Sequence, residues 1–446
     1  MDGGLRRSIG PTGAFFLTVS CLSPSIAVFI VGSDVMGQVG TAVFPCFVAA
    51  ALLGLIMACV YGELGSAFPG AGGEYTIFAR VFGRLAGHGI VGLNLIGFSI
   101  SLALSGHGVA TYLTALWPGT PPQACAAATV AVVTGVAVLN VEVGAWVTGT
   151  FLMTELVALV VVCLLGFGHA ARPASALFEL LAGRGDGLAA PGYAALGAAA
   201  ASSIYAFNGY GAAIFFGEDM KDPARHTAPV ILAALVAGVV IVMPPIAATV
   251  LGAPDLHLAF RAPATVMAVV RRLGGETVAR VMSVGVALAL FNTAVAIALM
   301  AGRQLYATGR DRLWPVPISR VLAATHRNWG SPGAATLVMG GFGLAGTLLP
   351  ERILLLILGN SNVITYAGLC IAALWGRRSG STEGAPWRMP AFPLPPLLGL
   401  LFLVVVAGFS LADAAGQIGF LVSVATLVIS ALLFSRTGSD ATRGSR

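Results

Sequence analysis

Long apolar runs separated by short polar breaks recur along the whole chain. A membrane-spanning helix needs about 20 apolar residues to cross roughly 30 Å of hydrocarbon. The third and fourth runs are continuous, and we divide them at the Trp-Pro-Gly-Thr-Pro-Pro turn of residues 117–122, which cannot continue a helix. The pattern then predicts twelve transmembrane helices, at 13–36, 41–62, 88–113, 123–140, 144–168, 194–217, 228–251, 280–306, 332–349, 353–375, 394–411 and 415–434.

Composition supports an all-α integral membrane protein. The chain is 57% hydrophobic and 9% charged, with a mean hydropathy of +0.91, whereas roughly a quarter of the residues of a soluble domain are charged. This excludes a soluble domain on a membrane anchor. The six cysteines and six histidines show no metal-ligand spacing. We therefore predict no metal and no cofactor.

The positive charges predict the orientation of the chain. Cytoplasmic loops retain Lys and Arg, and with the N-terminus inside the cell seventeen of the 24 basic residues lie on the cytoplasmic side. Both termini are therefore expected in the cytoplasm, with the helices in the cytoplasmic (plasma) membrane. This orientation explains the net charge of +6 without a nucleic-acid partner.

Two of the predicted helices are interrupted halfway. Residues 21–27 read Cys-Leu-Ser-Pro-Ser-Ile-Ala, and residues 207–211 read Phe-Asn-Gly-Tyr-Gly. A broken helix in hydrocarbon leaves backbone N–H and C=O groups without partners unless they face protein, water or a ligand. Because the breaks lie five helices apart, they favour a five-plus-five inverted repeat, as in secondary transporters. The alternative is a simple proline kink and a glycine packing face.

Three further segments resemble a known family. Residues 207–210 followed by Gly-Glu-Asp-Met-Lys-Asp-Pro at 217–223, Phe-Pro-Gly-Ala-Gly-Gly-Glu-Tyr at 68–75, and Gly-Arg-Asp-Arg-Leu-Trp-Pro at 309–315 are similar to motifs of the amino acid-polyamine-organocation permeases. The resemblance implies the leucine-transporter-type fold, with two peripheral C-terminal helices, and transport of an amino acid or amine by alternating access.

This resemblance divides the chain into seven segments. They are a cytoplasmic N-terminus (1–12), a first repeat (13–168), an extracellular loop (169–193), a second repeat (194–376), a cytoplasmic loop (377–393), helices eleven and twelve (394–434) and a cytoplasmic tail (435–446).

The breaks supply the predicted substrate site. Helix N-termini expose N–H groups that suit a carboxylate, and unwound carbonyls suit an ammonium. The site is expected to comprise Ser23, Ser25, Ile26, Ala27, Phe207, Asn208, Gly209 and Tyr210. Pro24 departs from the glycine-rich pattern of the family and has no N–H, which favours a decarboxylated amine. The side chain of Asn208 either lines the site or caps the freed backbone.

Three residues are candidates for ion coupling, and four for a gate. Glu155 lies centrally in the fifth predicted helix, where a carboxylate costs about 2.5–3.5 kcal/mol on insertion scales. It is expected to carry a proton, to pair with a cationic substrate or Na⁺, or to form a structural hydrogen bond. His107 is a titratable group or a packing residue, and Thr293 is a candidate sodium ligand. At the cytoplasmic mouth, Arg6, Arg7, Glu218 and Asp219 form a gate or remain solvated loop charges.

The function expected from these features is secondary active transport of an amino acid, amine or polyamine, as ion-coupled symport or as exchange. Two other classes of function stay open. A sensor on the same fold binds its solute without flux, and an integral-membrane enzyme needs clustered catalytic groups, which the scattered histidines do not provide.

Overall fold

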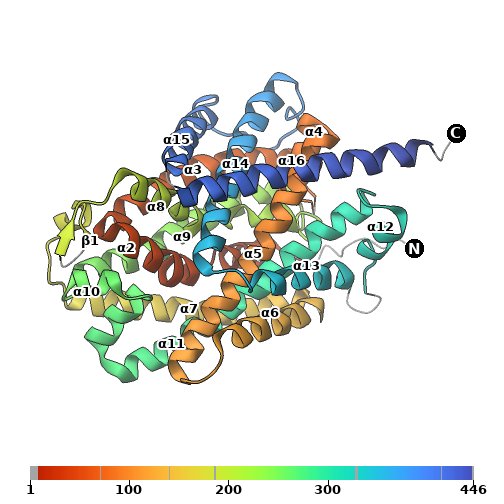
Figure 1. Ribbon diagram of the computed structural model, residues 1–446. Coiled ribbons are helices and arrows are strands. Elements are labelled where there is room, and N and C mark those ends of the chain that lie inside the picture. The colour runs from red at the N-terminus through yellow and green to blue at the C-terminus, as the bar shows by residue number, and fades with distance from the viewer. Residues whose placement is uncertain are drawn as a thin grey trace.

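A computed structural model describes residues 9–70, 72–139, 141–184, 187–326, 330–412 and 414–443. The described chain is a bundle of long helices with one small hairpin (Figure 1). Its elements are α1 (Pro11–Leu22), η1 (Ile26–Gly32), α2 (Ser33–Val39), η2 (Gly40–Ala42), α3 (Val43–Ala67), α4 (Glu74–Phe82), α5 (Arg84–Leu116), α6 (Pro122–Leu139), α7 (Val141–Gly168), η3 (Ala174–Phe178), β1 (Ala182–Arg184), β2 (Gly187–Ala189), α8 (Tyr193–Ala206), η4 (Tyr210–Phe216), α9 (Pro223–Gly252), α10 (Leu256–Arg261), α11 (Thr265–Arg310), α12 (Val316–Leu322), α13 (Gly333–Gly346), α14 (Glu351–Arg378), α15 (Leu394–Leu411) and α16 (Ala414–Arg443).

Each predicted transmembrane range lies mostly within helix among the described residues. Among the described residues, nine helical segments are long and apolar enough to cross a membrane, and the first of them, Pro11–Ala67, contains two predicted ranges. The sixth and ninth predicted ranges correspond to shorter helices, α8 and α13. The structure therefore supports an all-helical membrane protein, while the count of twelve and the inverted repeat stay predictions.

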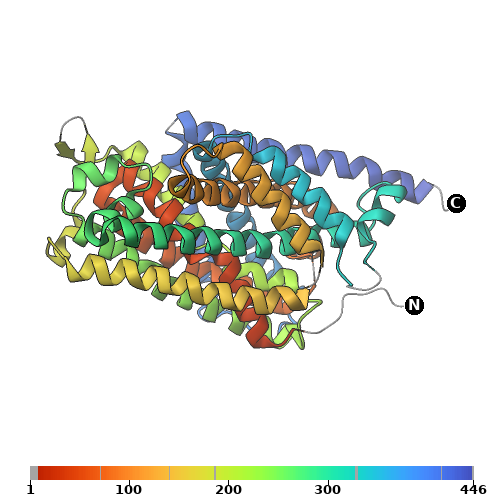
Figure 2. The ribbon, with the colours of Figure 1, turned by 90° about the horizontal axis from the view of Figure 1, so that it is seen from below.

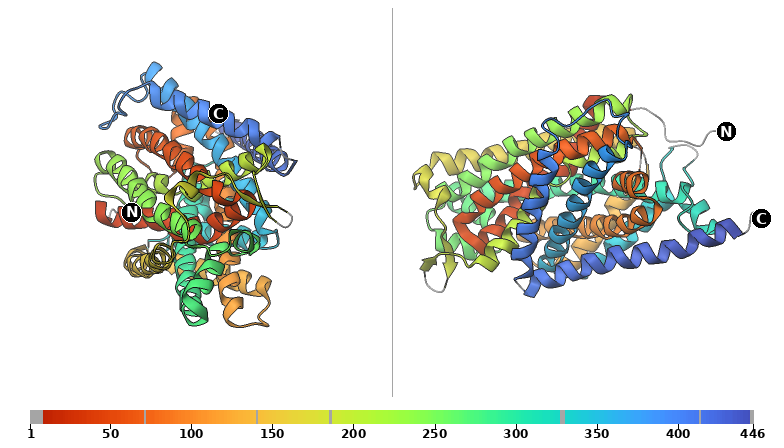
Figure 3. Two further views of the ribbon diagram at one scale, coloured as in Figure 1. Left: turned by 90° about the vertical axis from the view of Figure 1, so that its left-hand side faces the viewer. Right: turned by 90° about the horizontal axis from the view of Figure 1, so that it is seen from above.

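The long helix α5 lies at the centre of the packing. It contacts α4, α6, α11, α13, α14 and α16. The long helix α16 runs along the outside of the bundle (Figure 3). Segments predicted on opposite sides of the membrane lie at opposite ends of the described chain. The β1–β2 hairpin and α10 are at one end, while α12, the start of α1 and the end of α16 are at the other (Figures 1 and 2).

The first predicted break is narrower than expected. Helix α1 ends at Leu22, and the backbone of the next residue, Ser23, is left-handed (φ 51°). Helix resumes at Pro24 and continues as the π-helix η1. The interruption predicted within residues 21–27 is therefore confined to Ser23, and Ser25, Ile26 and Ala27 lie in the first turns of the second half-helix. A proline needs no N–H partner in the first turn of a helix, so Pro24 begins the second half-helix instead of disrupting it.

The second predicted break is present. Helix α8 ends at Ala206, Gly209 has a φ of 109°, and a 3₁₀ segment follows from Tyr210. The two breaks touch each other, because a β-carbon on Gly209 would lie 2.5 Å from both the carbonyl oxygen of Cys21 and the nitrogen of Leu22. Only glycine satisfies both the backbone angle and this close approach.

Helix α11 also differs from its predicted range of 280–306. It begins at Thr265 and includes a sharp kink at Gly275, whose φ is 80°. Gly275 joins a first helical stretch, which follows α10, to the long apolar stretch that the sequence pattern predicted.

Gly209→Ala is expected to destabilise the protein. The positive φ alone costs a non-glycine residue about 1–3 kcal/mol, and the new β-carbon would push the backbone of Cys21 and Leu22 away. We expect a lower midpoint of thermal unfolding in detergent. Gly285→Ala is the matched control, since a β-carbon at Gly285 in α11 meets no atom within 4 Å. Equal midpoints for the two variants would contradict the close approach of the two breaks.

Candidate functional site

A cavity of about 80 Å³ lies beside both breaks. Its walls come from the end of α1, from η1 and η4, and from α3, α4, α5, α8, α11 and α14. Most of its wall is apolar. The polar lining residues are Ser23, Tyr61, Glu74, Asn94, Ser101, Tyr205, Asn208, Ser361, Asn362 and Thr365. The volume suits a small solute.

The cavity includes half of the predicted substrate residues. Ser23, Ile26, Asn208 and Gly209 line it, whereas Ser25, Ala27, Phe207 and Tyr210 are not among the lining residues. The latter four are buried and support the site from behind. The ring of Phe207 packs edge-on against Phe47, and that of Tyr210 against Tyr61.

Asn208 has both of the roles that the sequence left open, because it lines the site and also caps the freed backbone. It lines the cavity, and its side-chain oxygen accepts a hydrogen bond from the N–H of Gly209 at 2.8 Å. Its amide nitrogen donates to Asn362 Oδ1 at 3.0 Å, and the Tyr366 hydroxyl donates to Asn208 Oδ1 at 3.3 Å. One side chain thus satisfies part of the broken helix and ties it to α14.

The N–H groups at the start of the second half-helix are satisfied by the protein itself. Ile26 N–H donates to Ser23 Oγ at 3.2 Å, and Ala27 N–H donates to the Ser23 carbonyl at 3.0 Å. Ser25 N–H donates to Glu155 Oε1 at 2.5 Å, and Pro24 has no N–H. Ser25, Ile26 and Ala27 are predicted to donate their N–H groups to a solute, but in this structure all three N–H groups already have acceptors within the protein.

Glu155 lies behind the first break and outside the cavity lining. It is fully buried in α7, and within the described part of the chain its Oε2 has no hydrogen-bond partner. A buried carboxylate without a cationic partner is costly, so this position suits a group that takes up a proton or a cation.

The other two coupling candidates lie in different places. Thr293 Oγ1 donates to Ser23 Oγ at 2.7 Å, in a fully buried contact between α11 and the first break. His107 lies beside the backbone of Thr347 and Leu349 at the end of α13 and is not among the cavity-lining residues. The structure therefore brings Glu155 and Thr293 to the first break, and places His107 away from it.

Glu74 is a lining residue that sequence reasoning did not single out. It begins α4, is 7% exposed, and accepts hydrogen bonds from the Tyr61 hydroxyl at 2.7 Å and from Asn94 Nδ2 at 2.9 Å. Burial raises the pKa of the Glu74 carboxyl, and the hydrogen bonds from Tyr61 and Asn94 oppose that rise. The only signal for this residue was a carboxylate inside the glycine-rich 68–75 segment.

Tyr61 and Tyr205 also line the cavity, and the sequence did not reveal them for a different reason. Tyrosine counts as apolar in the hydropathy pattern, so its hydroxyl gives no signal inside an apolar run. The Tyr61 ring packs edge-on against Tyr210 and Tyr366, at 5.9 and 6.0 Å between centroids. Tyr205 donates to Ser101 Oγ at 3.2 Å.

The predicted gate carboxylates bind arginines of α11. Asp219 pairs with Arg303 at 2.6 Å, with both side chains buried (5% and 0% exposed), and Arg303 also lies over the Phe216 ring. Glu218 pairs with Arg310 in a partly exposed contact. Arg6 and Arg7, the predicted partners, lie outside the described residues, so their pairing stays a prediction.

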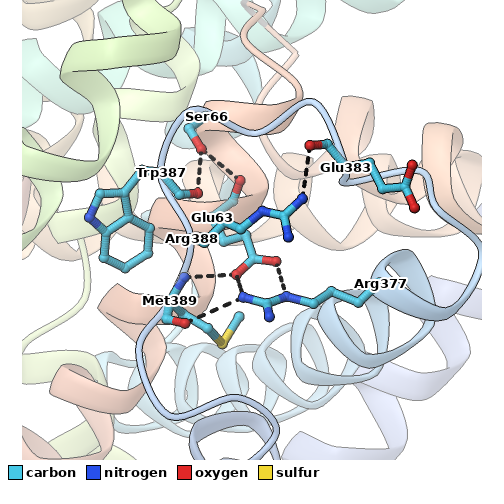
Figure 4. A network of polar contacts seen from close by, with 7 residues as sticks. All are labelled: Glu63, Ser66, Arg377, Glu383, Trp387, Arg388 and Met389. Atoms are coloured by element: carbon cyan, nitrogen blue, oxygen red, sulfur yellow. Dashed lines mark hydrogen bonds and ion pairs between the residues drawn. The ribbon is translucent and has the colours of Figure 1, made fainter.

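Another carboxylate paired with an arginine, that of Glu63, fastens the 379–393 segment to α3 (Figure 4). Glu63, 1% exposed, accepts two hydrogen bonds of 2.7 Å from Arg377, and one of 2.8 Å from the backbone N–H of Met389. Ser66 donates to the carbonyl of Trp387 at 3.2 Å. The segment predicted as a cytoplasmic loop is thus held against the bundle at several points.

Family comparisons agree with this architecture. Residues 9–432 match the family model described as amino acid permease. Three curated relatives, one from Mycobacterium bovis and two from strains of Mycobacterium tuberculosis, are each 29% identical over 395 residues, which is 84% of this chain and 82% of the relative. All three are named uncharacterized transporters.

Asp219→Asn is expected to lower the free energy of unfolding by about 3–5 kcal/mol, because it leaves the buried Arg303 guanidinium without its counter-charge. Glu218→Gln is the control, since a partly exposed pair contributes about 1 kcal/mol or less. Thermal or denaturant unfolding in detergent measures both variants. If Glu218→Gln lowers the free energy of unfolding as much as Asp219→Asn does, the larger stabilising effect assigned to the buried pair of Asp219 and Arg303 is contradicted.

Arg377→Ala is expected to release the 379–393 segment, because Met389 is then held through a carboxylate that has lost its cation. Trypsin should cleave after Arg388 faster than in the parent protein, as followed by mass spectrometry. Arg378→Ala removes the neighbouring exposed arginine and should leave that rate unchanged. Unchanged cleavage in Arg377→Ala would contradict the anchoring role of the pair with Glu63.

Proposed function

We propose that this chain, which belongs to the amino acid permease family, is a secondary transporter that moves an amino acid or a related amine across the cytoplasmic membrane by alternating access. The observation that supports this most strongly is the cavity beside two interrupted helices that touch at Gly209 and Cys21. A small solute bound there would contact both halves of the proposed repeat. Relative movement of the halves would then expose it to either side of the membrane.

Both termini are proposed to lie in the cytoplasm, as the distribution of arginines indicates. On that orientation α4, the 217–223 segment and α12 face the cytoplasm. The buried pair of Asp219 and Arg303, which joins the segment after η4 to α11, then lies on the cytoplasmic side of the cavity. We propose that this pair must separate, or move as a unit, when the cavity opens inward.

Coupling is proposed to involve Glu155. Its carboxylate contacts the Ser25 N–H at the first break, so a change in its protonation alters a hydrogen bond that holds the second half-helix. A proton is the ion that this geometry favours. Thr293, in contact with Ser23, is the residue through which sodium coupling would act.

Counterflow in proteoliposomes tests the proposal. Vesicles containing the purified protein and a high concentration of one unlabelled amino acid or amine should accumulate the same labelled compound transiently, and with saturation. A sensor on this fold would bind the compound without any flux. Absence of counterflow across a panel of amino acids, monoamines and polyamines would contradict transport.

Glu155→Gln is expected to remove the pH dependence of uptake while leaving counterflow intact, because glutamine still accepts from the Ser25 N–H but holds no titratable proton. Uptake and counterflow are measured over a series of pH values. His107→Gln, a change away from the cavity, should retain the parent pH profile. A Glu155→Gln profile identical to that of the parent would exclude this carboxyl as the proton carrier.

A further inference from the structure

The cavity lining that the structure describes carries negative charge only. Among the described residues that line it, Glu74 is the single carboxylate, and no lysine, arginine or histidine is present. The side chain is more than nine-tenths buried, and each of its two oxygens accepts one hydrogen bond. A carboxylate offers about four acceptor positions, so Glu74 keeps capacity for a further donor.

The lining around Glu74 is aromatic. Tyr61, Phe98, Tyr205 and Phe215 all line the cavity, and Phe98 and Phe215 meet edge-on at 5.5 Å. Aromatic faces attract organic cations, by about 0.5–2 kcal/mol for each contact depending on exposure. A carboxylate among aromatic rings is a suitable environment for an ammonium group.

The position that a solute carboxylate would occupy is already filled. The first N–H groups of the second half-helix donate to Glu155 and to Ser23, as described above. The Glu155 carboxylate itself lies where an anionic solute group would bind a helix N-terminus. A second carboxylate at this helix N-terminus would face like charge, and the N–H groups of Ser25, Ile26 and Ala27 already have acceptors. An unpaired buried charge is strongly unfavourable.

We propose, as a deepening of the transporter function above, that the solute is an amine without a carboxylate, with Glu74 as its counter-ion and Glu155 as the group that excludes amino acids. The ammonium binds Glu74 in the aromatic part of the cavity. Asn362 Nδ2, a buried lining donor without a partner in the described chain, is available for a hydroxyl or carbonyl oxygen of the same solute.

Matched pairs of compounds test this proposal. The purified full-length protein is screened by thermal shift and by counterflow with phenylalanine and phenethylamine, leucine and 3-methylbutylamine, and ornithine and putrescine. A ligand that binds the folded form raises its apparent stability. We expect at least one amine to raise the unfolding midpoint and to exchange, and its parent amino acid to bind at least ten-fold more weakly.

Variants of Glu74 identify the counter-ion. Glu74→Gln should weaken binding of the active amine at least ten-fold, and Glu74→Asp, which keeps the charge, should retain more of the affinity. Glu383→Gln removes an exposed carboxylate that does not line the cavity and should leave binding unchanged. Equal affinity for the amine in Glu74→Gln and in the parent protein would overturn the role of Glu74.

The outcomes separate this inference from the proposed function. If amino acids exchange and their amines do not, the transporter proposal stands and the exclusion of carboxylates is overturned. If neither member of any pair binds or exchanges, the inference and the transporter proposal are both contradicted for these solutes.

Discussion

The structure depends on how two membrane helices satisfy the backbone groups that their interruptions set free. In hydrocarbon each unsatisfied N–H or C=O costs several kcal/mol. At the first break the donors go to Ser23 and Glu155, and at the second Asn208 accepts from Gly209. Because these partners belong to the protein, the N–H groups of Ser25, Ile26 and Gly209 do not require a solute as their acceptor.

The same constraint explains the different environments of the buried carboxylates. Asp219 and Glu63 are each paired with an arginine, so they join helices. Glu155 meets a helix N-terminus, and Glu74 meets a tyrosine hydroxyl and an amide. Among the residues that the structure describes, Glu155 and Glu74 have no cationic side chain as a hydrogen-bond or ion-pair partner. They are therefore the carboxylates whose charge a proton or a solute would balance.

Much of the fold follows from the sequence, because runs of about 20 apolar residues have few alternatives to a helix in a membrane. The second break was also predictable, since Asn208 and Gly209 stand in the middle of such a run. The extent of the first break was not, because Pro24 disrupts a helix interior but is harmless in a first turn. Lining residues such as Tyr61, Glu74 and Asn94 meet only through tertiary packing, which no local pattern records. Even Glu155, whose depth was predicted, gave no indication that it would bind the Ser25 N–H.

A transported solute is expected to occupy the cavity beside the two breaks. Cys21 lines that cavity two residues before Ser23, so its thiol reports on occupancy. The most direct measurement is the rate of Cys21 modification by a small thiol reagent, in a transport-competent variant whose other five cysteines are replaced. We expect a transported solute to slow the modification of Cys21, with half-protection at the concentration that half-saturates transport. A modification rate that is unaffected by saturating solute would contradict it.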